Sequence, residues 1–427
     1  MASDPDLSRI RTPTTQDPVF AKSGAALNRL AGDLPRIGIA LSGGGDSTAL
    51  MHLAHAWAQG RVLMAATVDH GLRAESAEEA RQAHRAASAL GIPHATLLWQ
   101  RDNDAGNLMA EARDARLRLL SGWAMRNNLD AVLLGHTMDD QAETLLMRLA
   151  RGSGVDGLAG MADSRSAFGT RWLRPILGVS RAELRDWLTA RGIAWIDDPS
   201  NENADYDRVR IRKALQVLDL PALQLAQTSA NMAMARDALQ DFAMQVATGA
   251  KAQNGVLRLP LTAFRRAPQE IRRRLLVAGL RFVTGGDYPP RREAVLHVLN
   301  ALNTAPRITL DGVIAEPRGD WLLLQREPAA AAKAMPVAPE AGDDALWDGR
   351  WRLEGLVAGN EVRALGYEPL PALNWRASGL TRDEAAASPG VWMDGALIAA
   401  PLLTTHAKIA AVPLRGLPEF QALLYTH

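Results

Sequence analysis

The sequence predicts an α/β protein in which an N-terminal doubly wound parallel sheet is followed by a mainly helical domain and a small α+β C-terminal domain. From residue 36 to residue 150, short apolar runs alternate regularly with segments of helical periodicity. Polar motifs follow several of these runs, where a parallel sheet binds its ligands. From residue 219 onward, this alternation gives way to longer helices and then to short strands.

Length and composition indicate a globular protein of several domains. The 427 residues exceed the roughly 100–200 of a typical domain. The fractions of apolar residues, 47%, and of charged residues, 22%, argue against disorder. No apolar run approaches the roughly 18 residues of a membrane span, and the N-terminus lacks an apolar signal region, so we expect a cytoplasmic protein without a membrane segment. The absence of cysteine excludes disulfides, thiolate zinc sites, persulfide chemistry and cysteine-ligated clusters.

The first predicted domain covers residues 35–218 and follows an N-terminal extension, residues 1–34, that ends in a short helix near Ala21–Leu30. Its expected elements are, in order, strand 36–41, helix 47–58, strand 62–69, helix 75–90, strand 94–99, helix 108–126, strand 131–135 and helix 138–150. A further helix, Ser180–Arg191, begins with a serine cap and carries Glu183 at the capping-box position.

Beyond residue 218 we expect a helical, arginine-rich domain over residues 219–326, with a long helix near 222–247 and three short strands after residue 306. Residues 265–292 carry eight arginines and two acids, which fits either a nucleic-acid surface or a solvated basic face. Residues 327–345 are rich in Ala and Pro and are predicted to be a linker. Residues 346–427 are predicted to form the small C-terminal domain.

A glycine-rich turn joins the first strand and the first helix of the domain, and its residues are Ser42, Gly43, Gly44, Gly45, Asp46 and Ser47. Consecutive glycines let successive N–H groups point at one anion, and the helix N-terminus adds partial positive charge, so the turn is suited to cradle phosphate. Asp46 stands where another class of phosphate loop has lysine, so we expect Mg²⁺ to bridge Asp46 and a pyrophosphate group, with both serine hydroxyls donating to phosphate. The alternative is a tight turn capped by Ser47.

Two other motifs are ambiguous when each is considered alone. Asp69 opens the stretch 69–76 directly after the second strand, where an acid followed by glycine is commonly only a turn. Arg113 and Arg116 are three residues apart and share a helical face, which fits anion binding or a solvated face.

The stretch 135–144 is more specific because three acids, Asp139, Asp140 and Glu143, occupy the first turns of a helix. The helix dipole accounts for one acid at this position but not for three. Three acids beside a nucleotide pocket suit a metal ion or a cationic co-substrate.

Together, the motifs resemble the tRNA(Ile)-lysidine synthetase family of the PP-loop, or N-type, ATP pyrophosphatases. The resemblance covers about the first 215 residues, and the motifs that carry it are SGGGDS at 42–47, DHGLRAES at 69–76, EARDAR at 111–116, GHTMDDQAET at 135–144, RPIL at 174–177 and DPSN at 198–201. It implies that ATP adenylates the C2 oxygen of the wobble cytidine of tRNA(Ile) with a CAU anticodon. The ε-amine of free lysine then displaces AMP and leaves lysidine.

The resemblance also implies a role for each motif. The glycine-rich turn, Asp69 and His136 would bind ATP, and Asp46 would hold Mg²⁺. Asp46, Asp140 and Glu143 would be the catalytic residues, the last two also binding lysine. Either Arg113 or Arg116, together with Arg208 and Arg212, would hold the anticodon nucleotide and its phosphates.

Two other functions fit part of the sequence. A PP-loop enzyme that thiolates tRNA would share the phosphate cradle, but its sulfur chemistry normally needs cysteines, which this chain lacks. A non-catalytic, ATP-dependent tRNA-binding module would not need Asp46, Asp140 and Glu143 together. The sequence leaves the oligomeric state open.

Overall fold

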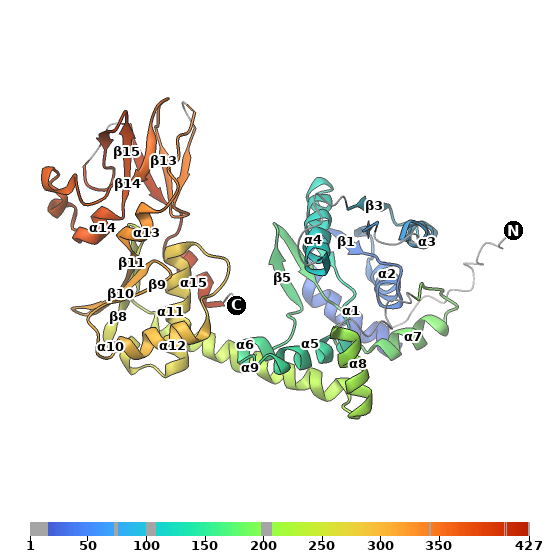
Figure 1. Ribbon diagram of the computed structural model, residues 1–427. Coiled ribbons are helices and arrows are strands. Elements are labelled where there is room, and N and C mark those ends of the chain that lie inside the picture. Colours follow the sequence, from blue (N-terminus) through green and yellow to red (C-terminus); the bar gives the residue numbers. More distant parts are fainter. Residues whose placement is uncertain are drawn as a thin grey trace. The chain divides into compact units, whose positions relative to one another are not determined.

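The structure is a computed structural model that describes residues 16–71, 76–99, 108–197, 207–340, 343–404, 406 and 408–425, apart from the side chains of 108–110, 113, 207, 208 and 216. The chain folds as two compact units, Met1–Met234 and Ala235–His427 (Figure 1). None of the helices in these described ranges combines the length and the apolar character needed to cross a bilayer.

The first unit contains the predicted parallel sheet, and the α/β fold class is confirmed. Its strands are β1 (Arg36–Ala40), β2 (Val62–Asp69), β3 (His94–Leu98), β4 (Ala131–Leu133), β5 (Ser164–Ala167) and β6 (Thr170–Leu173). They are ordered β3-β2-β1-β4-β6-β5, and all run parallel except β5, which pairs antiparallel with β6. This edge hairpin was not predicted. Its turn, Phe168-Gly169, has positive φ angles of 53° and 73°, and the glycine could have signalled it.

Helices connect these strands and pack on both faces of the sheet. Those described in the first unit are α1 (Pro18–Ala31), α2 (Gly45–Trp57), α3 (Ser76–Ala89), α4 (Leu108–Arg126), α5 (Met138–Ala150), α6 (Val155–Leu158), α7 (Arg181–Thr189) and α8 (Asp207–Val217), together with the first part of α9 (Ala222–Val246). Most boundaries lie within two residues of those predicted. The alternation of Arg208, Arg210 and Arg212 with apolar residues, which could suggest a strand, lies within the helix α8.

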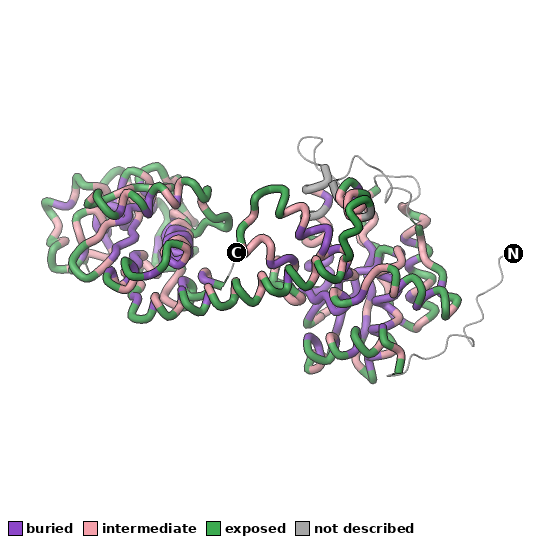
Figure 2. Tube along the Cα trace, turned by 90° about the horizontal axis from the view of Figure 1, so that it is seen from below, coloured by how far each residue is buried: buried purple, intermediate pink, exposed green. Residues whose placement is uncertain are grey.

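Alternate residues of the strands enter two different cores. Ile37 and Ile39 of β1 pack with α1, α2, α3 and α7 on one face of the sheet. Ala40 of β1 and Val132 of β4 pack with α4 on the other face. The period of two along each strand produces this division, and the buried segments lie at the centre of the unit (Figure 2). Because β1 is covered on both faces, the turn that follows it is held on a rigid support.

The second unit is helical and also carries a five-stranded antiparallel sheet. Its strands are ordered β7 (Lys251–Gln253), β8 (Val256–Pro260), β11 (Trp321–Arg326), β10 (Val313–Arg318) and β9 (Ile308–Leu310). The sheet packs with the second part of α9, α10 (Leu261–Arg266), α11 (Gln269–Thr284) and α12 (Arg292–Ala301). Strands β9, β10 and β11 were predicted. The β7–β8 hairpin was missed although Asn254-Gly255, its turn, is a strong hairpin signal.

The last part of the chain forms two three-stranded antiparallel sheets and short helices. One sheet is ordered β12 (Ala345–Trp347), β13 (Trp351–Glu354) and β17 (Ala410–Pro413), and the other β14 (Glu361–Ala364), β15 (Pro389–Met393) and β16 (Ala396–Ala399). The short helices are η3 (Leu370–Ala372), η4 (Trp375–Ser378) and α14 (Arg382–Ala386). The final helix, α15 (Leu417–Tyr425), returns to the five-stranded part, where Phe420 packs edge to face on Phe282 of α11 with ring centroids 6.3 Å apart.

The stretch 327–345, expected to be a linker, is instead packed over much of its described length. It contains helix α13 (Pro328–Ala332), and Ala331 in that helix is fully buried. Val337 forms an isolated antiparallel bridge with Val362 of β14. Alanine and proline give no clear periodicity, but small side chains allow this close packing.

Candidate active site

The glycine-rich turn lies between β1 and α2, as predicted. Gly43 has a positive φ of 84°, which disfavours other residues, and a Cβ atom there would come within 2.5 Å of Ile196 Cδ1. The backbone of Ile196 lies against the turn, since its N–H donates to the Gly43 carbonyl at 2.9 Å. The segment after α7 therefore fixes the shape of the turn from one side.

Hydroxyl groups brace the turn from within. Ser47 Oγ donates to the Gly44 carbonyl at 3.0 Å and accepts from the Ser42 backbone N–H at 3.1 Å. The two serine hydroxyls lie 3.0 Å apart, and Thr48 Oγ1 donates to the Gly43 carbonyl at 3.1 Å. Ser47 is buried and Ser42 is exposed, so Ser42 presents the hydroxyl that can reach an anion most directly.

Helix α2 begins at Gly45, two residues earlier than predicted, so Asp46 and Ser47 lie inside its first turn. The N–H groups of a first helical turn have no partner within the helix and can bind an anion. A Cβ atom on Gly135 would come within 3.1 Å of the Ser47 backbone N and Cα atoms. The glycine therefore lets the stretch before α5 approach the anion-binding end of α2.

The first turn of α5 is held by a capping box. Thr137 is the N-cap, and its N–H and its hydroxyl donate to Asp140 Oδ2 at 2.8 and 2.9 Å. Asp140 is thus partly a capping residue, which was the alternative explanation for one acid of this group. The other oxygen of this carboxylate, Asp140 Oδ1, is not used by the cap and lies 3.4 Å from Nη2 of Arg181.

Arg181, at the first position of α7, joins the acids of α2 and α5. Its Nε lies 3.1 Å from Asp46 Oδ2, its Nη2 3.4 Å from Asp140 Oδ1 and its Nη1 3.4 Å from Glu143 Oε1. Its backbone N–H donates to Asp139 Oδ2 at 2.7 Å. We call Asp46, Asp139, Asp140 and Glu143 the acid cluster, and it contains the predicted acids of the glycine-rich turn and of the stretch 135–144.

Burial and charge oppose each other at this cluster. Burial raises the pKa of Asp46, and Asp140 and Asp139 add to that rise, while Arg181 acts in the opposite direction. Burial would lower the pKa of Arg181, but the surrounding carboxylates hold it above its ordinary value. The guanidinium therefore stays charged, and the ionised form of Asp46 is disfavoured unless more positive charge arrives.

His136 is held by Arg174, a residue of the Arg-Pro-Ile-Leu motif. Arg174 Nε donates to His136 Nδ1 at 3.1 Å, and Arg174 Nη1 donates to the Ala162 carbonyl at 2.6 Å. Because Nδ1 accepts this hydrogen bond, the proton of the neutral imidazole is on Nε2. The ring can thus present an N–H donor, a suitable group for contact with a nucleotide.

Asp69 stabilises a turn after β2, because its Oδ1 accepts a hydrogen bond from the Gly71 N–H at 2.9 Å. This is the structural role that the sequence offered as an alternative to ligand binding. A hydrogen bond from Ser76 and this backbone contact lower the pKa of Asp69. Next to it, burial and then the nearby charge of Arg116 lower the pKa of His70. Arg116 therefore lies close enough to the end of β2 for its charge to act on His70. This proximity is consistent with both segments belonging to one binding region.

The other predicted arginines are only partly described. Arg212 of α8 donates through Nε to Glu143 Oε1 at 3.0 Å, so it contacts the acid cluster directly. The side chains of Arg113 and Arg208 lie outside the described residues, as do residues 72–75 and the Asp-Pro-Ser-Asn motif at 198–201. Their predicted roles stay predictions.

Arg181 and Arg174 were missed as site residues. The Arg-Pro-Ile-Leu motif was a usable signal for Arg174. Arg181 stood next to the predicted cap Ser180 but gave no signal of its own, because Asp46 is 135 residues away in the chain.

A cavity of about 430 Å³ lies between α2, α3 and the segment 193–196. It shares Gly43 and Thr48 with the turn, and none of the acid cluster lines it. His52 and Arg85 are its ionisable lining residues among those described. Burial, with a smaller contribution from His55, lowers the pKa of His52 to about 4.

This shift predicts a pH dependence of stability. A histidine whose folded-state pKa is depressed keeps its full contribution to stability above its ordinary pKa, and the contribution is lost as the pH falls towards the folded value. When the pH falls from 7 to 4.5, we expect the unfolding free energy of the parent chain to decrease by about 2 kcal/mol more than that of His52→Gln. Urea denaturation of both chains at several pH values measures this difference. Parallel pH profiles would contradict the assignment.

Within the described ranges, no group of three or more histidine and acidic side chains is arranged to hold a metal ion by itself. Mg²⁺ is commonly held by one or two carboxylates together with substrate phosphates, rather than by protein ligands alone. Asp46 lies in the first turn of α2, and 23% of its side chain is exposed. It therefore fits a site in which one carboxylate holds Mg²⁺ together with substrate phosphates.

A family model described as a PP-loop domain matches residues 20–218. A tRNA(Ile)-lysidine synthase of Ruegeria pomeroyi is 46% identical over 400 residues, covering 92% of this chain and 94% of the relative. Another, of Wolbachia pipientis wMel, is 32% identical over 347 residues, covering 78% and 80%. Among solved structures, a U34-tRNA thiolase of Methanococcus maripaludis aligns with a TM-score of 0.43 and 17% identity, covering 50% of this chain and 77% of that one.

The match to the Ruegeria relative extends over nearly the whole of both chains, so it spans parts of both compact units. The resemblance that the motifs predicted is confirmed. The chain belongs to the tRNA(Ile)-lysidine synthase family.

Proposed function

We propose that this chain converts the wobble cytidine of tRNA(Ile) with a CAU anticodon to lysidine, using ATP and free lysine. Family membership supports the reaction. The observation that carries it at the site is the meeting of Asp46, from the phosphate-binding turn, with Asp140 and Glu143 of α5 around one positive charge. A polyphosphate bound at the turn and a cation bound at α5 would therefore lie next to each other, as this reaction requires.

ATP would lie with its phosphates on the turn and the first turn of α2, and Asp69 and His136 would contact the nucleotide. Asp46 would hold Mg²⁺, which supplies positive charge to the pyrophosphate as it leaves. The backbone N–H groups of Gly43, Gly44 and Gly45 and the hydroxyl of Ser42 would bind the same leaving group. The nucleophile is the C2 oxygen of cytidine, and its attack on the α-phosphate yields adenylated cytidine and pyrophosphate.

Lysine would place its side-chain ammonium at Asp140 and Glu143. An ammonium ion cannot attack, so one carboxylate must first accept a proton from it. The free amine then bonds to C2, AMP departs with the C2 oxygen, and the nitrogen loses a second proton. The buried setting of Glu143, with 1% of its side chain exposed, strengthens the attraction for the cation.

The function is tested by incubating the full-length chain with ATP, Mg²⁺ and tRNA(Ile), with and without lysine. We expect AMP and pyrophosphate as products, and a wobble nucleoside whose mass has increased by lysine minus water. ADP and orthophosphate as the first products would contradict attack at the α-phosphate. Unmodified cytidine despite ATP binding would favour a non-catalytic tRNA-binding module.

We further propose that residues 35–218 form the catalytic domain and that the arginine-rich domain of residues 219–326 contacts tRNA. The arginines of this domain differ in their exposure, and the buried ones are not available to tRNA. Arg274 has a fully buried side chain 3.1 Å from Glu270, and Arg273 pairs with the same acid at 2.7 Å. Both are among the eight arginines that suggested a basic surface, but counting charges could not reveal that Glu270, one turn earlier, pairs with them. The exposed arginines of this segment are Arg265, Arg266, Arg291 and Arg292.

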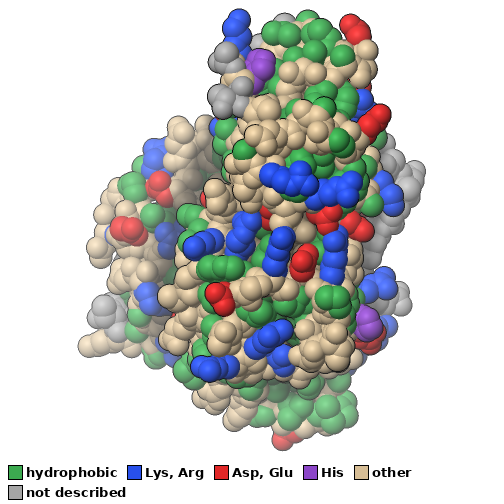
Figure 3. All heavy atoms as spheres, turned by 90° about the vertical axis from the view of Figure 1, so that its left-hand side faces the viewer, with side chains coloured by type: hydrophobic (Ala, Val, Ile, Leu, Met, Phe, Trp, Pro, Cys, Tyr) green, Lys and Arg blue, Asp and Glu red, His purple; other side chains and the backbone are tan. Residues whose placement is uncertain are grey.

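On the side of the second unit seen in Figure 3, basic side chains form a band with acidic side chains between them. We expect alanine at Arg265, Arg266, Arg291 and Arg292 to weaken tRNA binding and to flatten its salt dependence, by roughly one unit of slope for each phosphate that is no longer neutralised. Binding titrations at several salt concentrations measure the slope. An unchanged slope would make this a solvated basic face. Alanine at Arg273 and Arg274 should instead lower the unfolding free energy.

A further inference from the structure

Arg181 occupies the position that the proposed function gives to the lysine ammonium. Its three side-chain nitrogens each contact a different carboxylate, those of Asp46, Asp140 and Glu143. Of its side chain, 18% is exposed. Among the described residues, Arg212 also contacts this cluster, through Glu143. Arg181 therefore already supplies positive charge at the place where the lysine ammonium would bind.

While Arg181 stays in place, each oxygen of Asp140 and Glu143 is either in contact with another group or buried out of reach of an ammonium ion. Asp140 Oδ2 is used by Thr137, and Asp140 Oδ1 faces Arg181. Glu143 Oε1 receives both Arg181 and Arg212. Glu143 Oε2 is buried and has no hydrogen-bond partner among the described residues. If these two acids bind lysine, the Arg181 side chain must move first.

The Arg181 contacts allow such a movement. Charge-assisted hydrogen bonds are typically about 2.7–2.9 Å long, whereas the contacts of Arg181 to Asp140 and Glu143 are both 3.4 Å. Its backbone, in contrast, is fixed by the Ser180–Glu183 capping box and by the bond to Asp139. The guanidinium can therefore leave the acids by side-chain rotation while α7 stays in place.

The phosphate-binding turn provides the destination. Asp46, in the first turn of α2, also makes the shortest of the three contacts to the Arg181 guanidinium group, at 3.1 Å. A bound triphosphate brings several negative charges to this place, and the planar fork of arginine suits phosphate oxygens. The guanidinium can then exchange the carboxylates of Asp140 and Glu143 for phosphate oxygens. Its positive charge stays paired with negative charge throughout.

We propose that Arg181 couples the two substrates: it covers Asp140 and Glu143 in the free enzyme, and the polyphosphate of ATP draws it away so that lysine can bind. This inference rests on the proposed function. It makes Arg181 a positioning residue, because it acts on lysine through the two acids. By linkage, lysine must tighten ATP binding by the same factor as ATP tightens lysine binding.

The test is calorimetric titration of the full-length chain with lysine, with and without α,β-methylene ATP and Mg²⁺, and without tRNA. We expect the analogue to tighten lysine binding about 5-fold or more in the parent chain. In Arg181→Met, lysine affinity should be the same with and without the analogue. Arg181→Lys, which keeps the charge but loses the fork, should retain part of the coupling.

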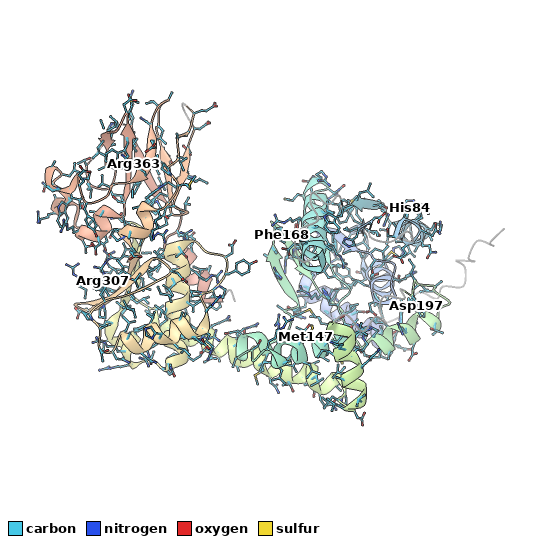
Figure 4. All side chains as sticks on the ribbon, viewed as in Figure 1. His84, Met147, Phe168, Asp197, Arg307 and Arg363 are labelled. Atoms are coloured by element: carbon cyan, nitrogen blue, oxygen red, sulfur yellow. The ribbon has the colours of Figure 1, made fainter. Side chains whose placement is uncertain are left out.

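Arg185→Met is the matched control. Arg185 lies one turn further along α7 and pairs at 3.5 Å with Asp197, the exposed residue labelled beside α7 in Figure 4. Its removal should leave the coupling unchanged.

Three results would overturn the inference. Equal lysine affinity with and without the analogue in the parent chain contradicts the coupling alone, and so does coupling that persists in Arg181→Met. A parent chain that does not bind lysine under either condition contradicts the lysine site, and the inference with it.

Discussion

Asp46→Asn is expected to slow adenylation of the cytidine by about 3 kcal/mol of transition-state stabilisation, or roughly 150-fold. The amide keeps the shape of the side chain but loses the charge that would hold Mg²⁺ against the leaving pyrophosphate. Pyrophosphate release in single-turnover reactions measures the rate. A rate close to that of the parent chain would show that the metal ion is bound elsewhere.

The same substitution should not destabilise the fold, which separates a catalytic from a structural effect. Burial raises the pKa of Asp46, so its ionised form is the costly one in the free protein. Arg181 keeps its contacts to Asp140 and Glu143 when Asp46 becomes neutral. We therefore expect an unchanged or slightly higher Tm. Asp186→Asn, at an exposed position in α7, is the control for loss of one negative charge and should leave the rate unchanged.

Local patterns were sufficient to predict the four strands β1 to β4, the turn and the acids, because each depends on residues that are close in sequence. The turn 42–47 is contiguous, and Asp140 and Glu143 are one helical turn apart. The carboxyl ends of parallel strands lie at one edge of a sheet, so the fold class alone brings these two motifs together. The capping box at Ser180 was likewise readable, since it needs only residues 180 and 183.

Contacts between distant segments could not be predicted in this way. Arg181 is 135 residues from Asp46 and 41 from Asp140, and nothing in its neighbouring sequence distinguishes it from an exposed arginine. Arg274 shows the opposite error, because its position in a run of three arginines suggested exposure although its side chain is fully buried. Whether an arginine is paired or buried depends on contacts that form only in the packed fold. The local sequence therefore does not tell a structural arginine from one that binds a ligand.

Asp140→Asn is expected to impair the use of lysine while leaving adenylation active. A hydrogen bond to a charged group contributes about 1.5–3 kcal/mol, which corresponds to roughly a 10- to 150-fold loss in kcat/KM for lysine. The asparagine oxygen can still accept from Thr137, but its amide presents no charge to an ammonium ion. Lysine-dependent release of AMP should therefore slow, whereas pyrophosphate release without lysine should continue.

The helix cap provides the control that this prediction needs, because Asp140 has two functions in the structure. Thr137→Val removes the hydroxyl that donates to Asp140 Oδ2 at 2.9 Å but keeps both the side-chain volume and the carboxylate charge. Loss of a cap costs about 1 kcal/mol of stability, so this variant should unfold more easily yet retain its KM for lysine. If Thr137→Val reproduced the lysine defect, helix capping would explain it rather than charge. If Asp140→Asn left both kcat and the KM for lysine unaltered, Asp139 or Glu143 would have to bind the ammonium group instead.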